Sequence, residues 1–181
     1  MAEILNQKFF NRPTTKVAKE LLGKFLVCRF PRESAPDLRK SASHEMAVMI
    51  TETEAYDGPN DKASHASRGK TKRTEPMFGK AGNFYVYLIY GMYYLLNIVT
   101  GPKNYPAAVL IRGVKITGPR REIRANAKPP KLNGPGKITK YLGITNKINA
   151  KPADRKTGVW FEDRGIKIKP GQIVAGKRIG V

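Results

Sequence analysis

Two runs of apolar and aromatic residues dominate the hydrophobic pattern of the chain. Residues 84–90 read Phe-Tyr-Val-Tyr-Leu-Ile-Tyr and residues 93–99 read Tyr-Tyr-Leu-Leu-Asn-Ile-Val, with Gly91 and Met92 between them. Aromatic and β-branched residues on both sides of a short glycine-containing connection are typical of two antiparallel strands joined by a tight turn. The pattern therefore predicts a β-hairpin over 84–99.

Shorter apolar runs predict the remaining elements. Apolar residues at helical spacing, between capping threonines and Gly23, predict a helix over 14–22. Residues 31–44 contain prolines, serines and mixed charges and predict an exposed loop. No repeat or long linker divides the chain, so we expect one α+β domain over 1–181 around a mainly antiparallel sheet. Its other strands are expected over 25–30, 47–55, 107–114, 157–161, 166–168 and 173–179, with short helices over 119–127 and 137–142.

The charge of the chain is the first indication of function. Its 181 residues include 34 Lys and Arg against 14 Asp and Glu, which gives a net charge of +20. Such an excess favours a polyanionic partner, with nucleic acid ahead of an anionic membrane surface. Because hydrophobic residues make up 40% of the chain and lie in patterned runs, we expect it to fold and not to remain disordered.

The amino terminus and the cysteine content indicate an intracellular protein. The first residues lack a basic region followed by an apolar one, and no apolar run is long enough to span a bilayer. The single cysteine, Cys28, excludes an internal disulfide, a cysteine-rich zinc site and a four-cysteine iron–sulfur cluster. We therefore expect a soluble, cytoplasmic protein in a reducing compartment.

Two carboxylates lie at the end of one predicted strand. Glu52 and Glu54 are two residues apart, so in a strand they point to the same face. For Glu52 we favour a solvated charge or an ion pair with one of the many cations. Glu54 directly precedes Ala55, Tyr56 and a turn, a position where loops commonly carry function. A carboxylate there could act as a general base on water.

Four further positions leave more than one interpretation open. Tyr90, at the predicted hairpin tip, is either a tolerated exposed aromatic residue or a wedge that inserts between nucleic-acid bases. A lone histidine such as His65 is more often a hydrogen-bonded structural residue than a catalyst. No metal site is expected, because the only other histidine, His44, lacks ligand spacing. Asn97 and Arg112 interrupt apolar strands, and buried polar groups must be paired with protein or ligand.

The order of these signals along the chain carries more information than any one of them. The chain resembles the alkyladenine (3-methyladenine) DNA glycosylase family, and the resemblance extends from Phe9 to Val181. It rests on Glu-Thr-Glu-Ala-Tyr at 52–56, Asp61 and His65, Met77-Phe78, Tyr-Val-Tyr-Leu-Ile-Tyr-Gly at 85–91, Asn97, and Leu-Ile-Arg at 110–112. The resemblance implies one mixed domain with a curved antiparallel sheet, short helices and a protruding hairpin that inserts into DNA.

The resemblance also implies roles for individual residues. Glu54 matches the catalytic carboxylate that activates the attacking water, and Arg112 matches an arginine near that water and carboxylate. Tyr90 matches the side chain that fills the space left by the extruded nucleotide. The base-binding positions are implied as Tyr56 and His65 on one side of the flipped base, Tyr87 on the other, and Asn97 as the residue that helps to exclude the amino group of normal guanine.

The implied activity is that of a monofunctional DNA glycosylase. Such an enzyme flips alkylated or deaminated purines out of duplex DNA and hydrolyses the N-glycosidic bond, which starts base excision repair. The expected partner is double-stranded DNA with damaged purines, without cofactor, metal or membrane, and we expect a monomer associated with the nucleoid. The absence of a long amino-terminal extension favours a bacterial source. The alternative, a non-catalytic nucleic-acid-binding protein, would release no base from alkylated DNA.

Overall fold

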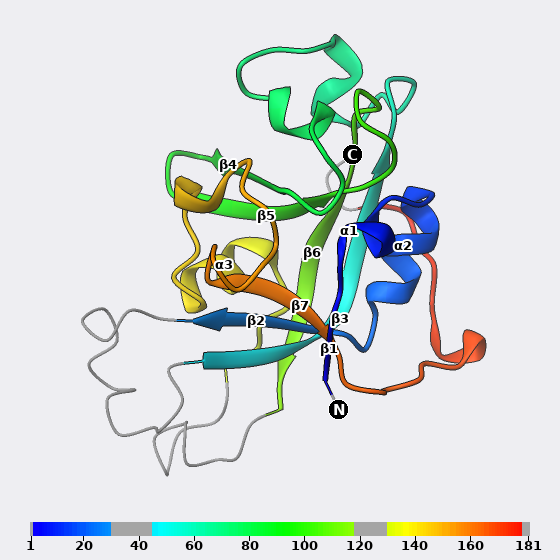
Figure 1. Ribbon diagram of the computed structural model, residues 1–181, viewed down its shortest axis with the longest axis vertical. Coiled ribbons are helices and arrows are strands. Elements are labelled where there is room, and N and C mark those ends of the chain that lie inside the picture. The colour runs from blue at the N-terminus through cyan, green and yellow to red at the C-terminus, as the bar shows by residue number, and fades with distance from the viewer. Residues whose placement is uncertain (1, 30–44, 118–129, 179–181) are drawn as a thin grey trace.

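One antiparallel sheet organises the part of the chain that the computed structural model describes, residues 2–29, 45–117 and 130–178. The sheet has seven strands in the order β1-β7-β2-β3-β6-β5-β4. In Figure 1 the long strands β3 and β6 run through the middle of the molecule, with the β4–β5 hairpin to one side. The strands are β1 (Glu3–Ile4), β2 (Phe25–Arg29), β3 (Glu45–Asp57), β4 (Phe84–Ile89), β5 (Tyr93–Val99), β6 (Ala107–Ile116) and β7 (Val159–Asp163).

Short helices surround this sheet. The α-helices are α1 (Gln7–Phe10), α2 (Thr14–Leu21) and α3 (Pro135–Tyr141), and Figure 1 shows α1 and α2 beside the long strands, away from the hairpin. Single 3-10 turns occupy His65–Arg68, Glu75–Phe78, Asn146–Ile148 and Pro170–Gln172. No helix in the described ranges is long and apolar enough to cross a membrane. The architecture confirms the α+β prediction with a mainly antiparallel sheet.

The core lies between one face of the sheet and the helices. Helix α2 buries Val17 and Leu21 fully, in one cluster with Val48 and Ile50 of β3. Helix α3 adds the fully buried Ile138 to the same cluster. Because apolar side chains occupy this face, the Glu52 and Glu54 carboxylates of β3 face the opposite side of the sheet. Thr53, between them, faces the helices and donates a hydrogen bond to the Ala18 carbonyl at 3.0 Å.

Two offset bulges decide which residues of β3 and β6 share a face. Ile50 pairs with Val114 and Glu52 with Gly113, so Thr51 is an extra residue in β3. The next pair is Thr53 with Ile111, so Arg112 is an extra residue in β6. A bulge bends its strand and changes the direction of a side chain. The paired shifts therefore restore the register beyond this point while they turn Arg112 toward the carboxylates of β3.

Most predicted elements are confirmed, with boundaries moved by a few residues. The two-residue strand β1 and the helix α1 were not predicted. The strands predicted over 166–168 and 173–179 are wrong within the described range, because the chain there has irregular backbone around one 3-10 turn. Ile166, Ile168 and Ile173 instead lie beside the end of α2, and Ile168 packs against Gly23. The predicted loop 31–44, helix 119–127 and last strand residue Ile179 lie outside the described residues.

The bulge leads to a prediction about stability. A Cβ at Gly113 would lie 2.8 Å from the Cβ of Glu52, so Gly113→Ala overpacks the junction of β3 and β6. We expect it to lower the free energy of unfolding by about 1–3 kcal/mol, measured by urea denaturation. Gly176→Ala is the matched control, because nothing lies within 4 Å of its added methyl group. Equal stability of the two variants would contradict the packing argument.

Candidate active site

One row of side chains crosses four strands on the face opposite the core. Tyr85 of β4 pairs with Asn97 of β5, Asn97 pairs with Leu110 of β6, and Leu110 pairs with Glu54 of β3. Residues that pair directly across antiparallel strands point to the same face of the sheet. Tyr56, two residues after Glu54, shares that face. The strand register alone thus gathers residues that are far apart in the sequence.

A cavity of about 350 Å³ lies over this row and brings together all of the predicted site residues. The loop between β3 and β4 contributes Ser64 and Met77 to its wall, and the hairpin contributes Ile89. No lysine lines the cavity in the part of the chain that is described. The predicted residues in its lining are Glu54, Tyr56, His65, Tyr87, Tyr90, Asn97 and Arg112.

Glu54 is the buried carboxylate of the cavity, with 7% of its surface exposed. The Tyr56 hydroxyl donates a hydrogen bond to its Oε2 at 3.0 Å, and Arg112 Nη1 lies 3.4 Å from its Oε1. The same guanidinium donates from Nε to Glu52 at 3.0 Å. This contact confirms the ion pair expected of Glu52, whose side chain is 45% exposed to solvent.

His65 joins the aromatic residues of β4. Its Nδ1 lies 3.1 Å from the Tyr85 hydroxyl, and its ring meets the Tyr87 ring edge-on at 4.6 Å between centroids. The residue as a whole is exposed to solvent, but partial burial of its imidazole lowers the pKa of His65, and repulsion from Arg73 lowers it further. The imidazole is therefore neutral at pH 7. The touching rings leave no space for a base between His65 and Tyr87 in this arrangement.

Three phenols of the cavity, those of Tyr56, Tyr85 and Tyr87, stay protonated at physiological pH. Burial raises the pKa of Tyr56 to about 12, and the neighbouring Glu54 carboxylate adds to the effect. Burial likewise raises the pKa of Tyr85 to about 12 and raises that of Tyr87. These side chains therefore act as apolar ring faces with hydroxyl donors and add no negative charge.

Asn97 is almost fully buried at the floor of the cavity. Its Nδ2 donates to the Tyr85 carbonyl at 3.1 Å and to the Leu95 carbonyl at 3.5 Å. The backbone of the hairpin thus fixes the orientation of the amide. This arrangement satisfies the requirement that a buried amide be hydrogen-bonded.

Tyr90 lies at the tip of the hairpin, away from any core. It is 85% exposed, and its φ of 51° lies in the left-handed region that non-glycine residues rarely adopt. Gly91 follows with φ of 68°, and the Met92 N–H closes the turn on the Ile89 carbonyl at 3.1 Å. The tight turn thus holds a large aromatic side chain out in solvent at the edge of the cavity.

The structure adds neighbours that the sequence did not indicate as site residues. Arg178 stacks on Tyr56, with 5.0 Å from its guanidinium carbon to the ring centroid, and pairs with Asp61. Arg73 lies over the Tyr87 ring at 5.3 Å. Arg178 is more than a hundred residues from Tyr56 in the sequence, so no local spacing could have associated them. Tyr85 belongs to the hairpin pattern and to the family motif at 85–91, but neither predicted a role for it in the site.

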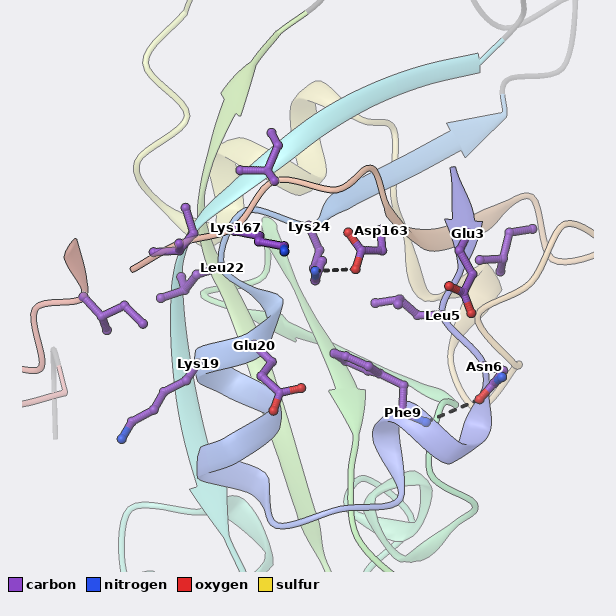
Figure 2. Close-up of a pocket in the computed structure, with 14 residues that line it drawn as sticks. Glu3, Leu5, Asn6, Phe9, Lys19, Glu20, Leu22, Lys24, Asp163 and Lys167 are labelled. Atoms are coloured by element: carbon purple, nitrogen blue, oxygen red, sulfur yellow. Dashed lines mark hydrogen bonds and ion pairs between the residues drawn. The ribbon is translucent and has the colours of Figure 1, made fainter. Parts of the chain in front are cut away.

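A second cavity, of about 630 Å³, contains none of the predicted residues (Figure 2). It lies between α2, the amino-terminal residues and the chain after β7. Lys24 and Asp163 within it form an ion pair at 2.6 Å. Neither cavity is a candidate metal site, because the described residues contain no cluster of three His, Cys, Asp or Glu side chains. Because the predicted site residues line the smaller of these two cavities, that cavity carries the candidate chemistry.

Comparisons with known proteins agree with this assignment. A relative from Rickettsia peacockii, provisionally named a 3-methyladenine DNA glycosylase, is 46% identical over 164 residues, which are 91% of this chain and 77% of the relative. One of the same name from Methanocella arvoryzae is 44% identical over an alignment of 185 positions, which covers 98% of this chain and 84% of its own. One from a Wolbachia strain is 49% identical over 146 residues, 81% and 67% of the two chains.

The match to a whole family agrees with these relatives and covers the complete site. The sequence model of the methylpurine-DNA glycosylase family matches residues 8–181, which include every strand from β2 to β7 and all residues of the row across the sheet. The chain therefore belongs to the methylpurine-DNA glycosylase family.

Proposed function

We propose that this chain is a monofunctional 3-methyladenine DNA glycosylase that starts base excision repair. It takes an alkylated or deaminated purine out of duplex DNA into the cavity and hydrolyses its N-glycosidic bond. The observation that supports this most directly is the buried Glu54 carboxylate, held between Arg112 and Tyr56 at the wall of a cavity with aromatic faces. Membership of the family supplies the substrate class.

Glu54 is proposed as the general base. Loss of the purine builds positive charge on the sugar, and a carboxylate beside it stabilises that charge and takes a proton from the attacking water. Arg112 and the Tyr56 hydroxyl hold the two carboxylate oxygens in place. Since no lysine lines the described cavity, water is the proposed nucleophile and strand nicking by an amine is not expected.

The cavity also suits the proposed base. Alkylated purines such as 3-methyladenine carry positive charge, which the faces of Tyr56 and Tyr87 attract by about 0.5–2 kcal/mol each. A neutral His65 does not repel that charge. For a base to stack between His65 and Tyr87, one of the two rings must move, because they are in contact here. Asn97, with its amide fixed by the backbone, is proposed to reject the amino group of guanine.

The alternative of a non-catalytic nucleic-acid-binding protein has less support. The charge of +20 fits both functions, since cations on phosphates give affinity without sequence preference. A binding protein, however, gains nothing from a buried carboxylate directed at a polyanion, and the relatives are named for a glycosylase. The monomeric state and the association with the nucleoid remain predictions.

The first test compares the two carboxylates. Glu54→Gln keeps the shape of the side chain but cannot accept the proton, so we expect single-turnover base release to fall roughly 10²–10⁴-fold. Lesion binding should remain close to that of the parent. Glu52→Gln is the matched control, because its amide still accepts the hydrogen bond from Arg112. Equal rates for the two variants on a duplex with one 3-methyladenine analogue would refute the assignment of Glu54 as the base.

A second test addresses Tyr90 as the wedge. Because its side chain is 85% exposed, Tyr90→Ala should leave the melting temperature nearly unchanged. The flipping equilibrium should shift toward the stacked state by about 1–3 kcal/mol, the scale of one aromatic–base stack. Fluorescence of a base analogue that brightens on extrusion measures this shift, and bulged DNA should show a smaller effect. A variant that melts several degrees lower yet flips the analogue normally would show that Tyr90 is structural.

A further inference from the structure

We propose that Arg178 is a positioning residue for the base cavity, delivered to it by the chain that follows β7. This inference rests on the proposed function, because it assigns Arg178 a role through Tyr56 and the loop that carries His65. Residues 164–178 are called the tail below. The tail has irregular backbone apart from the turn Pro170–Gln172.

The tail reaches the cavity by packing along the amino-terminal part of the fold. It leaves β7 and passes α2, as Figure 1 shows. Ile166, Ile168 and Ile173 line the second cavity together with Leu22 and Lys19. Figure 2 shows this cavity. Ile168 lies so close to Gly23 that a Cβ there would be 2.9 Å from its side chain. These contacts define the course of the tail before its last described residue.

Arg178 ends the described tail with a set of directed contacts. Its Nη2 donates to Asp61 Oδ1 at 2.8 Å, and its Nη1 donates both to Asp61 Oδ2 and, at 3.0 Å, to the Ala55 carbonyl. The same planar group stacks on the Tyr56 ring. A guanidinium can make a two-point contact with a carboxylate and stack on a ring at once, whereas a lysine ammonium cannot.

Asp61 connects Arg178 to the loop that carries His65. It is 11% exposed and also accepts hydrogen bonds from the Asp57 and Ala63 backbone N–H groups, both at 3.1 Å. The hydrogen bond from Arg178 is the main cause that holds the pKa of Asp61 below its usual range. The pair therefore fixes the loop between Tyr56 and His65.

Tyr56 connects Arg178 to Glu54, the proposed general base. Arg178 stacks on the Tyr56 ring, and the Tyr56 hydroxyl donates a hydrogen bond to Glu54. Arg178 itself is not among the residues that line the cavity, so it acts through Tyr56 and Asp61. Small displacements of groups that orient a substrate cost large factors in rate. We therefore expect loss of Arg178 to affect recognition of the damaged base more than binding of DNA in general.

The test compares Arg178→Ala and Arg178→Lys with Lys177→Ala, which removes the same charge one residue earlier from an exposed position. Both Arg178 variants should raise the half-saturating concentration of lesion duplex in single-turnover excision about tenfold. Binding of undamaged duplex should weaken equally in Arg178→Ala and Lys177→Ala. Asp61→Asn should reproduce the loss on the lesion duplex. Full recovery by Arg178→Lys, or identical behaviour of Arg178→Ala and Lys177→Ala, would overturn the proposal.

A readout independent of catalysis separates this inference from the proposed function. Hydrogen exchange of the Asp57 and Ala63 amides should accelerate in Arg178→Ala and stay unchanged in Lys177→Ala, measured at a temperature where all variants are folded. Faster exchange without any change in lesion kinetics would overturn the positioning role. If the parent protein releases no base, or Glu54→Gln releases it normally, the proposed function fails, whatever the exchange result.

Discussion

The guanidinium of Arg112 between two carboxylates is the interaction on which the candidate site depends. An unpaired carboxylate as buried as Glu54 would cost several kcal/mol, and removal of one partner from a buried pair typically costs about 3–5 kcal/mol. Arg112 reaches Glu52 and Glu54 together because it is the extra residue in a bulge of β6, offset from a bulge in β3. Gly113 permits the close approach, since any side chain there would meet Glu52. The register of β3 and β6 therefore determines which charged groups meet at the candidate site.

The sequence predicted the parts of this arrangement that depend on local pattern. The hairpin followed from two runs of aromatic and β-branched residues on either side of a short connection with Gly91, and Glu54 followed from its place at a strand end. Family resemblance then associated residues such as Asn97 and Tyr87, which the cavity does bring together. The bulges were not predictable, because nothing in the composition near Thr51 shows that the strand gains a residue. The tail was predicted as strands from its short apolar runs, but its described isoleucines line a cavity beside the end of α2 and pair with no strand. Arg178 could not be placed, since its partners are determined only by the complete fold.

The cavity combines rigid and strained parts. Its floor belongs to the sheet, where Asn97 and Glu54 are buried and paired, so their geometry changes little without disruption of the strands. Its rim is different, because Tyr90 adopts a left-handed conformation that costs a non-glycine residue roughly 1–2 kcal/mol. No burial compensates for that cost in the free protein. The strain is thus consistent with a side chain retained for contact with a partner and not for stability.

The cavity differs in charge from the chain around it. The described residues that line it include one carboxylate, Glu54, and one guanidinium, Arg112, which offset each other, and the protonated phenols of Tyr56 and Tyr85 add no charge. The chain as a whole carries +20. The positive charge that attracts phosphates therefore lies outside the cavity lining, and the cavity offers the phosphate backbone no net counter-charge. The contrast separates the two parts of a nucleotide, since it favours the backbone on the surface and leaves the hollow to a base without phosphate charge.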